Sequence, residues 1–237
     1  MPARPLWCAM TRYALLLLCA VSGISHAGVV VGGTRFVFPS SSETRTISVT
    51  NTSHQSWLIN SKINAPTLWQ GAVTFSGKPP ILATPPLFLL QPGATGTIRL
   101  VKMDNPIPND RETLFALSIA SIPSGRVEDR SVKVALRSSF KLFWRPASLT
   151  SSPDKAWQQV SWLRDAQGVT ASNPTPFYIN LAQVKVNGSP VDDAGVIPPL
   201  TQRHFTWCTA KTLCTLRWQT LNDLGGLTPV TEQRFPD

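Results

Sequence analysis

Short segments in which every second residue is apolar recur along this chain from Val29 onward, and turn-forming residues separate them. An alternation of period two is the pattern of strands that place one face on a core. The 21 prolines interrupt the chain, and long spans lack helical periodicity. These features predict an all-β protein of short strands with few helices.

The first group of segments is large enough for one immunoglobulin-like sandwich, which needs about seven strands. A bulge or a change of sheet is expected at Gly32-Gly33, between its first two segments. The predicted strands are Val29–Val31, Arg35–Phe38, Thr46–Asn51, Trp57–Ile63, Ile81–Leu90, Thr97–Val101, Thr113–Ile122 and Val132–Phe143.

Arg145-Pro146-Ala147 marks an expected domain boundary, because proline ends a strand ladder and a new group of segments follows. We expect domains at residues 28–146 and 147–237. Asn187-Gly188 predicts a hairpin, since both residue types tolerate positive φ. The predicted strands of the second domain are Trp157–Leu163, Phe177–Val186, His204–Cys208 and Cys214–Gln219.

Residues 1–27 have the features of an export signal: Arg4 and Arg12, then an apolar run from Tyr13 to Val21, then Ser25-His26-Ala27 as a cleavage site. The run is too short to span a bilayer. A lipoprotein signal is disfavoured, because Leu18 before Cys19 is not small. The mature chain is expected to begin at Gly28 and to be exported without insertion into the membrane.

Four cysteines are present, and Cys8 and Cys19 belong to the predicted signal. The remaining two, Cys208 and Cys214, are expected to form a structural disulfide across a hairpin, because exported chains are oxidised. A zinc site would need about four ligands, and only His204 lies nearby.

The charge balance is basic, with 22 Lys and Arg against 13 Asp and Glu. Without Arg4 and Arg12 the balance is 20 against 13, a net charge of +7. Nucleic acid or an acidic membrane could attract such a chain. The basic residues are scattered singly, however, which favours a basic soluble surface without a nucleic-acid partner.

Catalytic motifs are missing from the sequence. His54 and His204 lie in no nucleophile or metal motif, and no glycine-rich phosphate loop is present. We therefore expect no enzyme activity, cofactor or metal. Asn51-Thr52-Ser53 formally matches a glycosylation acceptor, but a turn is the simpler explanation.

The segment Val132–Phe143 is the longest regular alternation. Val132, Val134, Leu136 and Phe140, with Ser138, are expected on one face, and Lys133, Ala135, Arg137, Ser139 and Lys141 on the other. From composition alone, a plain edge strand packing its own core is the simpler interpretation.

The residues from Val134 to Pro146, VALRSSFKLFWRP, resemble the last strand and the exit of the first domain in PapD-like periplasmic chaperones of the chaperone-usher pathway. Further similar stretches lie in family order: Thr34–Phe38, Pro85–Phe88, Gln91–Gly93, Asn109–Phe115, Asn173–Tyr178 and Leu221–Gly226. The resemblance covers nearly all of the expected mature chain. It implies two immunoglobulin-like sandwiches in an L-shaped or boomerang arrangement.

The resemblance also implies a function. Such chaperones bind, fold and cap pilus or fimbrial subunits by lending them a strand, and deliver them to an outer-membrane usher. By position, Val132, Val134 and Leu136 match the lent apolar side chains. Arg35 and Lys141 match the pair that binds the subunit's C-terminal carboxylate. Glu112, Arg145 and Asp223 match a salt-bridge set between the domains.

Two stretches depart from the family pattern: Ser121–Ser124, where a double proline is more usual, and Pro198–Thr201. The short, cysteine-free stretch 123–131 resembles the subfamily with a short loop before the lent strand. A pilus subunit or adhesin, or a carbohydrate-binding sandwich, is the alternative. The free chaperone could also self-associate to cover its exposed strand.

Overall fold

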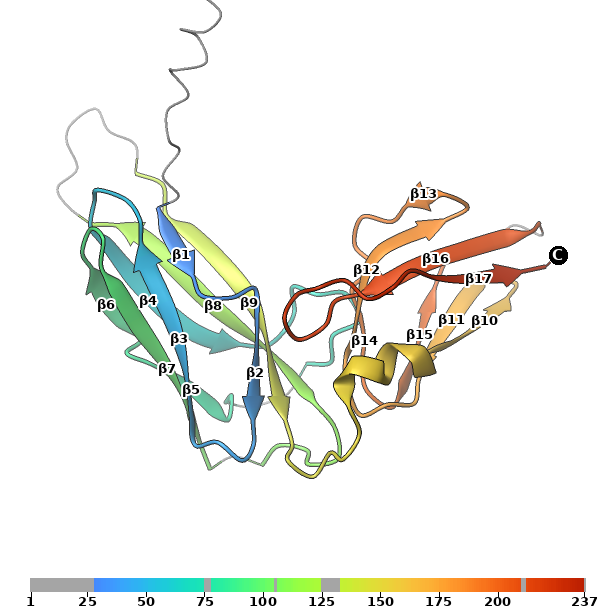
Figure 1. Ribbon diagram of the computed structural model, residues 1–237, viewed down its shortest axis with the longest axis horizontal. Helices are drawn as coiled ribbons and strands as arrows, with labels where there is room; N and C mark the ends of the chain where they lie inside the picture. The colour runs from blue at the N-terminus through green and yellow to red at the C-terminus, as the bar shows by residue number, and fades with distance from the viewer. Residues whose placement is uncertain (1–27, 75–77, 105, 125–132, 210–211, 237) are drawn as a thin grey trace, which may run out of the picture.

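The computed structural model describes residues 28–74, 78–104, 106–124, 133–209 and 212–236. The expected signal segment 1–27, most of the 123–131 stretch and Val132 therefore lie outside the described residues. Two β-sandwiches meet at an angle and give the molecule a bent outline (Figure 1). The all-β, two-domain architecture predicted from the sequence is confirmed. No helix in the described part of the chain is long and apolar enough to span a bilayer.

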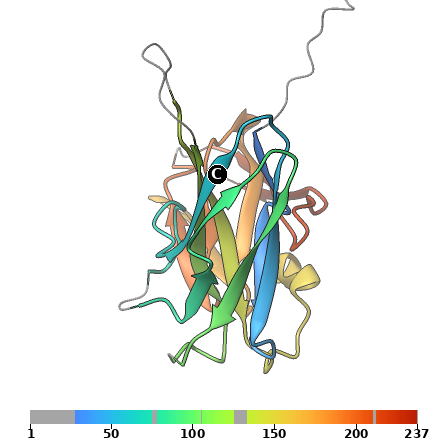
Figure 2. The same cartoon turned by 90° about the vertical axis from the view of Figure 1, so that its left-hand side faces the viewer.

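The first sandwich consists of two sheets, which Figure 2 views from the side away from the second sandwich. One sheet has the strand order β1-β3-β7-β5, and the other β2-β9-β8-β4-β6. The strands are β1 (Val29–Val31), β2 (Arg35–Pro39), β3 (Thr44–Asn51), β4 (Trp57–Asn64), β5 (Ile81–Thr84), β6 (Leu87–Leu90), β7 (Thr95–Lys102), β8 (Thr113–Pro123) and β9 (Leu136–Arg145).

The chain changes sheet at two points in this sandwich. The expected change at Gly32-Gly33 is confirmed, since β1 pairs with β3 and β2 with β9. The prediction of one strand over Ile81–Leu90 is wrong: β5 pairs with β7, and β6 pairs with β4 in the other sheet. Pro85 and Pro86 cause the break, because neither has an N–H for the ladder.

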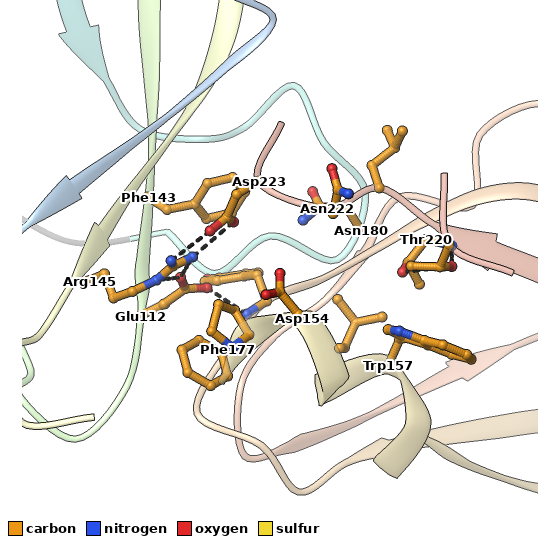
Figure 3. A pocket seen from close by; sticks show the side chains of 15 residues that line it. Glu112, Phe143, Arg145, Asp154, Trp157, Phe177, Asn180, Thr220, Asn222 and Asp223 are labelled. Carbon is orange, nitrogen blue, oxygen red and sulfur yellow. Dashed lines mark hydrogen bonds and ion pairs between the residues drawn. The ribbon is translucent and has the colours of Figure 1, made fainter. Parts of the chain in front are cut away.

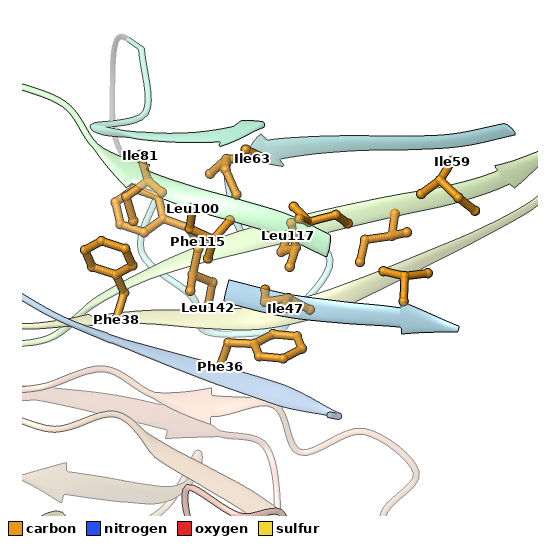
Figure 4. Packing of buried hydrophobic residues seen from close by; sticks show 14 of the residues in the cluster. Phe36, Phe38, Ile47, Ile59, Ile63, Ile81, Leu100, Phe115, Leu117 and Leu142 are labelled. Atoms are coloured by element: carbon orange, nitrogen blue, oxygen red, sulfur yellow. The ribbon is translucent and has the colours of Figure 1, made fainter. Parts of the chain in front are cut away.

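Alternating side chains from both sheets fill the core of the first sandwich (Figure 4). Phe38 is fully buried and stacks on Trp144 with ring centroids 5.3 Å apart. Phe36 and Leu142 are also buried. β2 and β9 direct these core residues inward. Because side chains alternate along a strand, the other residues of β2 and of this part of β9 face the second domain.

The second sandwich packs a sheet of order β10-β11-β15 against one of order β13-β12-β16-β17, with β14 also paired to β12. The predicted hairpin at Asn187-Gly188 is confirmed, with φ of 50° and 83°. The elements of the second sandwich are a 3-10 helix η1 (Pro153–Gln159) and the strands β10 (Ser161–Asp165), β11 (Gly168–Asn173), β12 (Ile179–Val186), β13 (Ser189–Pro190), β14 (Val196–Ile197), β15 (Thr201–Phe205), β16 (Cys214–Thr220) and β17 (Thr231–Phe235).

The predicted strand Trp157–Leu163 is wrong in its first half, which belongs to η1. Ser152 caps this helix by accepting a hydrogen bond from the Asp154 backbone N–H at 3.4 Å, and Pro153 occupies its first turn. A serine followed by proline and an acidic residue is a helix-start signal that the period-two pattern concealed.

The disulfide between Cys208 and Cys214 is present, but the prediction that it staples a hairpin is wrong. The expected strand His204–Cys208 is observed earlier, as β15, which pairs with β11. β16 pairs with β12 and β17 in the opposite sheet. The bridge therefore links the two layers of the sandwich.

The Asn51-Thr52-Ser53 stretch forms a turn, as expected. Asn51 is fully buried, and its Nδ2 donates to the Gln55 and Leu90 carbonyls at 2.7 and 3.2 Å. Its Oδ1 accepts from the Ser53 backbone N–H at 2.9 Å. Asn173 repeats this arrangement in the second sandwich.

Candidate functional site: the strand edge and cation pair between the sandwiches

β2 and β9 run parallel, in a register that makes Arg35 and Lys141 direct partners. Their neighbours Phe36 and Leu142 point into the first core. The alternation along each strand therefore turns Arg35 and Lys141 to the opposite face, toward the second domain. The two cations assigned to one site by family position do lie side by side.

Arg35 is half-buried and reaches across to the second domain. Its Nη1 donates to the Leu221 and Asn222 carbonyls at 3.0 and 2.9 Å. Burial lowers the pKa of Arg35 from its ordinary value, although the carboxylates of Asp223 and Glu112 oppose this change. The guanidinium stays charged at neutral pH and keeps donors to spare, since it has five.

Lys141 is a half-buried ammonium that forms no ion pair among the described residues. Burial and the neighbouring Arg35 lower its pKa to about 8, and Asp193 opposes this shift. The Nζ atom lies 5.5 Å from the centre of the Trp69 ring. Two adjacent cations, partly withdrawn from water, form a binding site suited to a carboxylate.

β9 has one free edge next to this pair. β8 pairs with β9 along Leu136–Trp144, whereas β2 pairs only with Lys141–Arg145. Within the described residues, no strand covers the other edge of Leu136–Phe140. Unpaired ladder groups on such an edge are a template for another strand.

The lent strand was predicted to begin at Val132, but β9 begins at Leu136. Residues 133–135 are outside the ladder: the last pair of β8 and β9 is Ser121 with Leu136, and Pro123, at the end of β8, offers no N–H. Leu136 and Val134 are 63% and 61% exposed. Phe140 packs against the first core, so the apolar face is buried at one end of β9 and open at the other.

Glu112, Arg145 and Asp223 also come together, at the pocket between the domains (Figure 3). Arg145 Nε donates to Glu112 Oε1 at 2.7 Å, and its Nη1 and Nη2 donate to the Asp223 carboxylate at 2.7 and 2.9 Å. Glu112 Oε2 accepts from the Tyr178 backbone N–H at 2.9 Å. One arginine thus joins carboxylates from both domains.

Burial raises the pKa of Glu112, which is only 4% exposed, while Arg145 opposes this shift. Arg145 has a raised pKa because its two carboxylate partners outweigh its own burial. An ion pair of this kind adds little net stability but is costly to break. We infer that it fixes how the domains meet.

Sequence reasoning missed the interdomain contact at Gln70. Gln70 lies between β4 and β5, and its carbonyl accepts hydrogen bonds from the Val196 N–H at 2.9 Å and from Arg203 Nη1 at 3.1 Å. A signal existed at Arg203, which shares the alternating face of β15 with the buried Phe205. The irregular segment around Trp69 offered no periodic signal.

The two histidines are placed apart. His54 lies in the turn after β3, and His204 is exposed on β15, where Nδ1 is 3.2 Å from Thr170 Oγ1. The described part of the chain contains no group of three or more His, Cys, Asp or Glu side chains that could hold a metal ion.

Comparison with known proteins gives a consistent result. Residues 28–150 match the family model described as "Pili and flagellar-assembly chaperone, PapD N-terminal domain", and residues 155–232 match "Pili assembly chaperone PapD, C-terminal domain". The chain is 55% identical to the fimbrial chaperone YcbF of Escherichia coli K12 over 230 residues, 95% of this chain and 98% of that protein. It is 29% identical to the chaperone protein FimC of the same strain, covering 94% and 91%.

Solved structures agree. A chain from the complex of the Salmonella enterica SafA pilin with the SafB chaperone matches with a TM-score of 0.76 at 25% identity, covering 90% of this chain and 99% of that one. The Escherichia coli chaperone DraB matches with a TM-score of 0.73 at 29% identity, covering 87% and 98%. These matches do not favour a subunit, an adhesin or a carbohydrate-binding protein. The chain belongs to the PapD-like family of chaperones, which assemble pili and are not enzymes.

Proposed function

We propose that the protein captures a pilus subunit by pairing the free edge of β9 with the subunit's sheet, while Arg35 and Lys141 bind the subunit's C-terminal carboxylate. The observation that carries this proposal is the register of β2 and β9. The free edge of Leu136–Phe140 ends where Arg35 and Lys141 begin the paired part. An added strand would therefore end at the two cations.

This geometry also sets the direction of the added strand. β9 runs from Leu136 toward Lys141, so a strand whose C-terminus meets Lys141 runs parallel to it. The added strand would occupy the same position in the sheet as β2, beside the part of β9 that precedes Lys141. Main-chain hydrogen bonds supply affinity, and the carboxylate fixes the register.

Apolar burial supplies the other part of the binding free energy. The exposed Val134 and Leu136 extend the apolar face of β9 beyond the first core. Together with Val132, three such side chains would contribute on the order of 5 to 9 kcal/mol before the costs of association. A subunit that lacks a strand of its own would present the complementary groove.

The family also supports the finer parts of this role. Similarity to fimbrial chaperones supports the proposal that the protein acts in the periplasm and that residues 1–27 are an export signal. It also supports the proposal that the protein releases the subunit to an outer-membrane usher. The free edge supports self-association of the unloaded protein, which would cover β9.

Co-expression with a pilus subunit and recovery of the complex test the proposal. Lys141→Ala and Arg35→Ala are expected to abolish recovery because the carboxylate loses its charge-assisted hydrogen bonds. Lys62→Ala is the matched control, because Lys62 is exposed on β4. Undiminished recovery with both anchor variants would refute the anchor assignment.

A further inference from the structure

The segment between β4 and β5 crosses from the first domain to the second. The Gln70 carbonyl accepts two hydrogen bonds there, from the Val196 backbone N–H and from Arg203. Neither bond involves Glu112, Arg145 or Asp223. The domains are therefore also joined here, at a contact that we call the Gln70 clamp and define as Gln70, Gly71, Gly195, Val196 and Arg203.

Arg203 serves this clamp as a donor to main-chain groups. Its Nη1 donates to the carbonyls of Gln70, Ala194 and Val196 at 3.1, 2.7 and 2.8 Å. The guanidinium carbon lies 4.5 Å from the centre of the Phe205 ring. Arg203 has no ion pair with a carboxylate among the described residues, and its Nη2 donates to the side-chain Oε1 of Gln70 at 3.4 Å.

Two glycines allow the main chains to approach this closely. Gly71 and Gly195 have φ of 77° and 70°, values that favour glycine. A Cβ on Gly71 would lie 2.4 Å from the Val196 carbonyl oxygen, and one on Gly195 would lie 2.2 Å from the Gln70 carbonyl oxygen. The clamp is thus a backbone contact that fixes the position of the residue before Gln70.

That residue is Trp69, which packs against an apolar cluster shared by the two domains, including Phe143 and Tyr178. The Lys141 ammonium lies over its ring, with 5.5 Å from the ring centre to Nζ. The face of an indole attracts an ammonium, and lysine has a flexible stem that needs such a constraint.

We propose that the Gln70 clamp holds Trp69 over Lys141, and that Trp69 is a positioning residue that keeps this ammonium beside Arg35 to receive the subunit's carboxylate. This inference rests on the proposed function. Arg35, on the neighbouring strand, repels Lys141, and Asp193 of the second domain attracts it. Trp69 opposes displacement of the ammonium out of the site.

Two matched substitutions separate positioning from packing. Trp69→Phe and Trp69→Leu both keep an apolar side chain, but only phenylalanine keeps a ring face. The probe is a peptide with the C-terminal strand of a pilus subunit, prepared as the free acid and as the C-terminal amide. Binding of each form is measured by calorimetry or fluorescence.

Trp69→Leu is expected to weaken binding of the free acid about 5- to 30-fold, the range for a partly desolvated cation–π contact, and to reduce its preference over the amide. Trp69→Phe should stay within about threefold of the unsubstituted protein. Arg203→Gln should change binding in the same direction as Trp69→Leu, and the double variant should be less than additive.

Lysine titration by NMR gives a readout that packing alone would not move. The Lys141 pKa should differ between Trp69→Leu and Trp69→Phe, because only one keeps the ring over the ammonium. The inference is overturned if these variants bind the free acid equally and give the same Lys141 pKa, while Lys141→Ala still loses the preference for acid over amide. If Lys141→Ala also keeps that preference, the proposed anchor function fails instead.

Discussion

At the scale of single residues, the site depends on two cations that alternate with core residues. Arg35 precedes Phe36, and Lys141 precedes Leu142, so each charge lies on the face opposite the first core. The parallel register of β2 and β9 then makes them neighbours. The resemblance to the family identified both residues in the sequence, but only the fold shows the strand pairing that places them together.

The lowered pKa of Lys141 predicts that carboxylate binding weakens in mildly alkaline solution. The ammonium is charged below its folded pKa of about 8 and loses its proton as the pH rises through that value. A bound carboxylate favours the charged form, so affinity should fall by up to about tenfold per pH unit above 8.

Calorimetry of the free-acid peptide between pH 7 and 9.5 measures this dependence. Lys141→Arg provides the control, because a guanidinium stays charged over the whole range and should bind with nearly constant affinity. An unsubstituted protein whose affinity is also constant above pH 8 would contradict the role of Lys141.

At the scale of elements, periodicity located most strands of the first sandwich to within two residues. It failed where another local signal competed with alternation. Pro85 and Pro86 split one expected strand between two sheets, and the cap at Ser152 started a helix inside another. Period two cannot show which edge of β9 stays unpaired, because pairing depends on where β2 begins.

The free edge of β9 predicts a specific effect of Leu136→Glu. A carboxylate on the exposed apolar face would have to enter an apolar groove unpaired, so subunit recovery should fall at least about tenfold. The unfolding free energy should change by less than about 0.5 kcal/mol, because Leu136 is 63% exposed in the free protein.

Leu163→Glu is the matched control, since Leu163 is 74% exposed on β10 in the second domain. It should leave both recovery and stability unchanged. Equal recovery with Leu136→Glu and Leu163→Glu would mean that the open end of β9 does not contact the subunit.

At the scale of the whole molecule, the bent arrangement rests on several interdomain contacts. Arg145 joins Glu112 and Asp223, Arg35 donates to carbonyls of the second domain, and the Gln70 clamp forms a further contact. The resemblance to the family predicted the ion-pair set. The Gln70 clamp depends largely on main-chain groups, which a side-chain pattern does not report.

Arg145→Ala should lower the unfolding free energy by about 3 kcal/mol at pH 7, because Glu112 would remain buried without its cation. Burial raises the folded pKa of Glu112, so this penalty should shrink as the pH falls through that raised value and the carboxyl becomes neutral. Chemical denaturation at several pH values measures it.

The exposed pair of Arg111 and Asp110 supplies the control. Arg111→Ala should leave stability unchanged, because exposed ion pairs contribute little. A similar loss in both variants would show that the buried position of Arg145 has no special importance for stability.

Hydrogen exchange of the β9 amides, measured with and without a bound subunit, directly tests whether a subunit strand pairs with β9. In an antiparallel ladder, alternate residues direct their N–H groups away from the partner strand, so part of Leu136–Phe140 donates toward the free edge. These amides are expected to exchange readily in the free protein and to become protected in the complex. A complex in which they exchange as fast as in the free protein would contradict strand addition at β9.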